Sequence, residues 1–124
     1  MCSSDLTARA WSQPFEWAIH AGEAQSRGIA DATIAAIARG KRPARMATDE
    51  AIVYDYLREL NATQAVRDVT YARAVSAFGE AGVVDLTAVA GYYTTLAMIL
   101  NVARTPLPPG DRSPLAELPA KPKS

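Results

Sequence analysis

The sequence predicts an all-α fold. Apolar side chains recur every three or four residues over several stretches, which is the helical period, and nowhere do they alternate as they would along a strand. Glycines and prolines mark where most of these stretches begin or end. At 124 residues the chain is long enough for one domain and too short for two. We therefore expect a single helical domain of about five helices.

The first two predicted helices are delimited by a proline and two glycines. Pro14 suits the first turn of a helix, because the N–H that proline lacks would have no partner there. A helix is expected over residues 14–27, with Gly28 as its C-terminal stop. A shorter helix is expected over residues 31–39, ended by Gly40.

The next two predicted helices begin at polar residues that suit an N-cap. Thr48 is followed by two acidic residues, whose charge the helix dipole favours in the first turn. Asp68 is expected to cap the following helix, which Gly79 and Gly82 end. The apolar stripes of the two helices are Val53, Leu57 and Leu60, and Tyr71, Val75 and Phe78.

The strongest helical pattern begins at Leu86. Its stripe consists of Leu86, Val89, Tyr93, Leu96 and Leu100. The helix is apolar on more than one side, which predicts a central position in the fold or a place in a subunit interface. Residues 86–103 carry no charge and are long enough to be a membrane candidate. Because they include several polar residues and are flanked by Asp85 and Arg104, we expect a buried helix of a soluble protein instead.

The two ends of the chain differ from residues 7–104, the expected helical domain. The segment MCSSDL, residues 1–6, resembles the in-frame translation of the end of a common sequencing adapter. We expect it to be non-native, with the natural chain extending further upstream; the alternative is a real, disordered tip. Residues 105–124 hold six of the eight prolines and are expected to form an extended arm. Three leucines could hold part of this arm against the domain or a neighbouring subunit: Leu107, Leu115 and Leu118.

The composition argues against several classes of protein. Thirteen basic residues balance thirteen acidic ones, so nucleic acid and anionic membrane surfaces are not expected partners. One cysteine, Cys2, and one histidine, His20, cannot make an internal disulfide or a zinc site, and we expect no metal. The N-terminus lacks the basic start and apolar run of a signal peptide, which predicts a cytoplasmic location.

The one histidine lies in the stretch QPFEWAIHA, residues 13–21. Glu16 precedes His20 by four residues, so a helix places the two side chains on one face. Two interpretations stay open. The pair could transfer a proton in an active site, or it could belong to a solvated polar face that Glu23 and Arg27 continue at the same helical spacing.

Several segments occur in a recognisable order. They are FEWAIHA, GIADATIAAIARGKRP, DEAIVYDYLREL and TYARAVSAFGEAGVVDLTAVAGYYTTLAMILN, with PLPPG behind the last. Over residues 8–115 this order resembles the carboxymuconolactone decarboxylase family. The resemblance implies an all-α, alkylhydroperoxidase-D-like domain that assembles into trimers or hexamers.

The resemblance also bears on the reaction. In the peroxidases of the family the first helix carries Cys-x-x-Cys and, after three more residues, a histidine. His20 matches that histidine, and the thiol positions fall on Gln13 and Glu16, which cannot form a thiolate. Thiol peroxidase activity is therefore not expected. The resemblance implies instead the decarboxylation of a small carboxylated lactone or related acid, as in the catabolism of aromatic compounds, without a cofactor.

Decarboxylation leaves negative charge that a proton must quench. His20 is expected to donate that proton, with Glu16 orienting it or keeping it protonated. The further substrate-pocket candidates are Gln13, Trp17, Tyr92 and Tyr93. Helical spacing favours core packing for the tryptophan and the two tyrosines, and Asn101 is expected to satisfy buried backbone groups. The alternative is a noncatalytic oligomeric binding or structural member of the family, or an inactive fragment.

Overall fold

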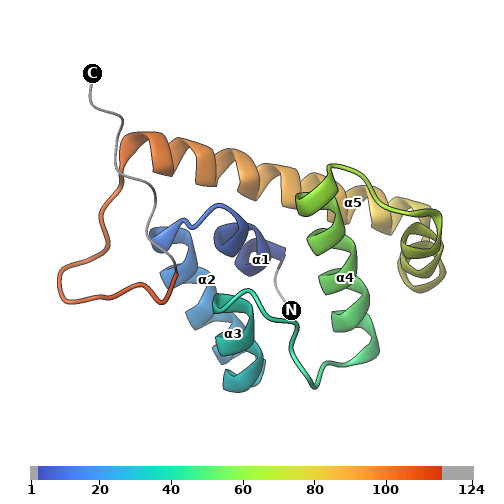
Figure 1. Ribbon diagram of the computed structural model, residues 1–124, viewed down its shortest axis with the longest axis horizontal. Coiled ribbons are helices and arrows are strands. Elements are labelled where there is room, and N and C mark those ends of the chain that lie inside the picture. Colours follow the sequence, from blue (N-terminus) through green and yellow to red (C-terminus); the bar gives the residue numbers. More distant parts are fainter. Residues whose placement is uncertain (1–2, 116–124) are drawn as a thin grey trace.

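The computed structural model describes residues 3–115, which form five α-helices and no strand. The helices are α1 (Ser3–Ala10), α2 (Pro14–Ser26), α3 (Asp31–Ala38), α4 (Thr48–Thr63) and α5 (Asp68–Ala103). In Figure 1, α5 is a long rod along one side of the molecule, and the four shorter helices lie beneath it. The all-α prediction is confirmed. The alkylhydroperoxidase-D-like arrangement remains a prediction.

The helix α1 lies at the centre of the molecule. It packs against each of the other four helices. Leu6, Thr7 and Ala8 are buried in it. This helix begins at Ser3 and was not predicted, because residues 1–6 were expected to be non-native. The origin of that segment remains a prediction, and residues 1 and 2 lie outside the described part of the chain.

The predicted stops of α2 and α3 are confirmed. Gly28 and Gly40 have φ of 87° and 68°, a left-handed conformation in which a side chain would be strained. The N–H one residue beyond each glycine donates to a carbonyl five residues earlier, as in a Schellman motif. These bonds are Ile29 N to Ala24 O, 3.0 Å, and Lys41 N to Ala36 O, 2.9 Å.

The predicted caps of α4 and α5 are wrong by one residue. Thr48 and Asp68 are the first helical residues, and the cap positions belong to Ala47 and Arg67. Neither cap residue bonds the helix start through its side chain. Carboxylates hold these positions instead: Glu50 accepts from Ala47 N at 3.0 Å, and Glu59 from Arg67 N at 2.6 Å. The contact from Glu59 of α4 connects two helices and could not be predicted from local sequence.

The two helices predicted over residues 68–78 and from residue 86 are parts of one element, α5. Gly79 interrupts it with φ of 73° and ψ of 168°, so the predicted break at this glycine is present. Gly82 is helical, and the predicted gap before Leu86 is therefore wrong. A single left-handed residue turns the chain without a loop, and Figure 1 shows the first turns of α5 set at an angle to the rest.

Part of the C-terminal arm lies along the domain. Residues 105–115 contain no helix, as expected. Leu115 is buried in the hydrophobic core, together with Trp17 and Leu57. In Figure 1 the segment after α5 turns back toward α2. Leu118 lies outside the described residues.

Most of α5 is exposed in the single chain. Its most apolar 18 residues are only 17% buried. The expectation of a buried helix is therefore wrong for the chain alone, because α5 packs against α1 and α4 on one side only. Its large exposed apolar residues after Gly79 are Val84, Val89, Tyr92, Met98, Ile99 and Val102. By length and composition α5 could also span a membrane, but a single helix of this kind is weak evidence for a membrane protein.

Candidate functional site

Gln13, the first of the predicted site residues along the chain, has a structural role. Its buried side-chain carbonyl accepts hydrogen bonds from the backbone N–H groups of Phe15, 2.6 Å, and Glu16, 3.0 Å, and so caps α2. Its amide donates to Oδ1 of Asn101 at 3.1 Å. Asn101 in turn donates to the carbonyl of Trp11 at 2.8 Å, so it satisfies a backbone group as predicted, although the bond is exposed and not buried. The cluster joins the start of α2 to the end of α5.

Glu16 is a buried acid without a hydrogen-bond partner. Its side chain lies in the first turn of α2 and the residue is 3% exposed. Neither carboxyl oxygen is hydrogen-bonded by any described residue. Burial raises the pKa of Glu16 from 4.5 to about 7. The interpretation of a solvated face is therefore wrong at this residue, and its carboxyl group can carry a proton near neutral pH.

His20 lies one turn further along α2 and makes a different contact from the predicted one. Its side chain is 13% exposed, and its Nδ1 lies 3.3 Å from Oε2 of Glu23. The expectation that Glu16 orients His20 is wrong, because the carboxyl of Glu16 has no partner. Residues three apart on a helix are also neighbours, and the exposed Glu23 reaches the ring whereas Glu16 faces the interior.

The aromatic candidates divide into one core residue and a surface row. Trp17 is buried in the core, which confirms its predicted packing role. The ring of Tyr93 meets the ring of His20 edge-on, with centroids 4.9 Å apart. The ring centroid of Tyr92 lies 5.4 Å from that of Tyr93. Tyr92 is 62% exposed, so its predicted packing role is wrong in the single chain. The structure thus brings His20 and the two tyrosines together and leaves Glu16 apart from them.

The described residues form cavities elsewhere in the molecule. Those with volumes of about 730, 260, 320 and 390 Å³ are lined by neither Glu16 nor His20. Trp17 and Pro114 line the cavity of 320 Å³, at the junction of α2, α3 and the C-terminal arm.

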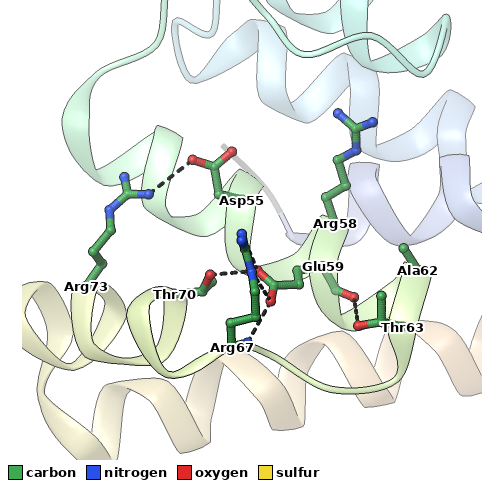
Figure 2. Close-up of a pocket in the computed structure, with 8 residues that line it drawn as sticks. All are labelled: Asp55, Arg58, Glu59, Ala62, Thr63, Arg67, Thr70 and Arg73. Atoms are coloured by element: carbon green, nitrogen blue, oxygen red, sulfur yellow. Dashed lines mark hydrogen bonds and ion pairs between the residues drawn. The ribbon is translucent and has the colours of Figure 1, made fainter.

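The cavity of 730 Å³ lies between α4 and the first turns of α5 and is rich in charge (Figure 2). Glu59 accepts from the hydroxyl of Thr70, 2.6 Å, and from Nε of Arg67, 3.0 Å. These two bonds, with one from the backbone of Arg67, lower the pKa of Glu59 from 4.5 to about 2.

The second acid of this cavity, Asp55, is also paired. Arg42 donates to its two carboxylate oxygens at 2.9 and 3.1 Å, and Arg73 to one of them at 3.4 Å. The hydrogen bonds from Arg42 and then Arg73 lower the pKa of Asp55. Sequence reasoning missed this cluster. Its one local signal was the spacing of Asp55 and Glu59, four residues apart on α4.

Comparisons of the chain with protein-family models, with curated proteins and with solved structures found no match. In the described part of the chain no three side chains of the metal-binding types are grouped together. The family resemblance and the activity that it implies remain predictions.

Proposed function

We propose that the chain is a carboxymuconolactone decarboxylase-like lyase, which removes carbon dioxide from a small carboxylated lactone or related acid without a cofactor. The observation that supports this proposal best is Glu16. A buried carboxyl group with no partner and a pKa of about 7 can hold and release a proton near neutral pH. This suits Glu16, more than His20, as the proton donor.

The proposed reaction uses this proton once in each turnover. The bond between the ring carbon and the substrate carboxylate breaks, carbon dioxide leaves, and the electron pair remains on the carbon. Because Glu16 lines none of the cavities of about 730, 260, 320 and 390 Å³, the substrate must displace neighbouring side chains to reach it. Protonated Glu16 then donates its proton to that carbon, and solvent returns a proton to the carboxylate. Because the protonated form is the active one, kcat should fall as the pH rises through about 7.

The test is an assay of carboxymuconolactone decarboxylation with four proteins. Glu16→Gln keeps the size of the side chain and should lower kcat by about 100-fold or more, the usual contribution of a positioned acid. His20→Gln separates the two candidate donors. Glu23→Gln is the matched control on the same helix and should stay within a few-fold of wild type. Full activity in both Glu16→Gln and His20→Gln, or no turnover by the folded wild-type protein, would contradict the proposal.

A second function, that of an oligomeric binding or structural protein, is favoured by α5. Its apolar residues after Gly79 would be covered if copies of the chain assembled along this helix. Light scattering after gel filtration should then give three or six times 13.2 kDa, and Ile99→Lys should lower that mass. A monomer that binds to lipid vesicles through α5 would support a membrane role instead.

A further inference from the structure

A second cavity, of about 260 Å³, opens between α1, α3 and α4. Its polar lining consists of Arg9, Tyr54, Arg58 and Asn61, and its apolar lining includes Leu6 and Ile37. Two guanidinium groups thus line a small cavity to which no acidic residue contributes.

Arg9 is held in place with one of its guanidinium nitrogens, Nε, lacking an acceptor among residues 3–115. Its guanidinium lies against Gly40, so closely that a Cβ atom there would be 2.7 Å from Nη2. Its Nε is buried and has no hydrogen-bond partner in the described part of the molecule. Leaving a buried charged donor without an acceptor is costly, and a group in this state calls for an explanation.

Arg58 is the second cation of this cavity, and it too has no ion pair among residues 3–115. The acids next to it on α4 are both engaged, Asp55 by Arg42 and Glu59 by Arg67. In Figure 2 the side chain of Arg58 extends away from the pair of Glu59 and Arg67. Its positive charge is therefore available to a ligand.

We propose that this cavity binds a small organic carboxylate between Arg9 and Arg58. Guanidinium groups match the planar, two-oxygen geometry of a carboxylate. The amide of Asn61 can add a hydrogen bond, and the apolar lining, with Ile37, suits the hydrocarbon part of an organic acid better than it suits inorganic phosphate. The site is separate from Glu16 and His20 and does not depend on the proposed decarboxylation.

The test measures binding of four probes to the folded chain by calorimetry and by NMR chemical shifts. The probes are benzoate, glutarate, the neutral isostere benzamide and inorganic phosphate. Saturable binding of benzoate or glutarate is expected, with no binding of benzamide. Arg9→Met and Arg58→Met should each weaken binding about 10-fold or more, the loss of one charge-assisted contact. Arg27→Met, which removes the exposed arginine that directly follows α2, should leave the affinity unchanged.

A substitution that keeps both charges tests the geometry. Gly40→Ala places a methyl group against the guanidinium of Arg9, and it also strains the left-handed backbone that ends α3. It should weaken binding while net charge is constant. Circular dichroism checks that each variant is folded, and Arg9→Lys serves in place of Arg9→Met if the latter is not. The proposal is overturned by three results: no carboxylate binding at about 10 mM, equal binding of benzamide, or binding that the arginine variants leave unchanged. Phosphate binding without carboxylate binding would also overturn it.

Discussion

Two cavities lie on neighbouring faces of α4 and share Arg58, but they differ in how their charges are balanced. Toward α5, Asp55 and Glu59 are each paired with arginine, and the cluster connects the two helices. Toward α1 and α3, Arg9 and Arg58 face a cavity without any acid. Arg58 aside, the charges of the larger cavity are therefore paired within the protein, whereas the two arginines of the smaller cavity are available to a ligand.

The number of charged residues around a cavity is therefore a poor guide to the charge that is available to a ligand. Paired surface charges contribute modestly to stability and offer little to a ligand. Among residues 3–115 the buried Nε of Arg9 has no acceptor, which lowers stability, whereas Arg58 is exposed and makes no ion pair. The two cavities differ in whether their charged side chains are paired with each other.

A core substitution in α4, the helix that lines both cavities, should change stability most. Leu57 is fully buried on this helix. Leu57→Ala should lower the free energy of unfolding by about 2–5 kcal/mol, measured by urea denaturation. Val102→Ala is the control, because Val102 is 87% exposed and its loss should change stability by less than about 0.5 kcal/mol. Equal urea midpoints for the two variants would contradict the burial of Leu57 in the core.

A buried acid with no partner and a paired acid should change the pH dependence of stability with opposite signs. The pKa of Glu16 is raised, so the folded state binds the proton more tightly than the unfolded state does. Stability from this group is present below about pH 4.5 and is lost as the pH rises to about 7. Glu16→Gln should therefore stabilise the protein at pH 8 by about 1 kcal/mol or more, and have little effect at pH 4.5. Equal effects at both pH values would contradict the assignment.

Glu59, the paired acid, should make stability depend on pH in the opposite direction. The pKa of Glu59 is lowered to about 2, so its contribution is complete above pH 4.5 and is lost as the pH falls toward 2. Glu59→Gln should lower the urea midpoint at pH 7 and remove this part of the acid sensitivity. Thr63→Val, in the same cavity, is a control that keeps the charge pairs.

Arg58, the unpaired cation of α4, should contribute least to stability. Arg58→Gln should change the free energy of unfolding by less than about 0.5 kcal/mol, because it breaks no ion pair of the described chain. If Arg58→Gln destabilises the protein as much as Glu59→Gln does, the distinction between the two cavities fails.

Local signals in the sequence were enough to predict much of the fold. Gly28 and Gly40 end their helices as predicted, and the predicted break at Gly79 is present. Each of these features depends on the backbone conformation of one residue, so the sequence alone indicates it. The start of α5 was misplaced because a carboxylate from another helix, that of Glu59, holds Arg67. The exposure of α5 could not be predicted, since periodicity shows that a helix has an apolar face without showing what covers it.

The candidate site was predicted less well. Spacing placed Glu16 and His20 on one face of a helix, but the direction of each side chain depends on how α2 packs against its neighbours, α1 and α3. The partner of His20 proved to be Glu23, one of several neighbours that the same spacing allows. Arg9 and Arg58 gave no signal, because they lie 49 residues apart in the sequence and are brought together only by the packing of α1 against α4.

The hydrogen bond between Gln13 and Asn101 has a consequence for the order of folding. It joins residues 88 positions apart, so nearly the whole chain must be arranged before it can form. Closing so long a loop is slow compared with forming the local bonds by which Gln13 caps its own helix. We expect Asn101→Ala to speed unfolding and to leave the refolding rate almost unchanged, which would mark this contact as one made after the transition state.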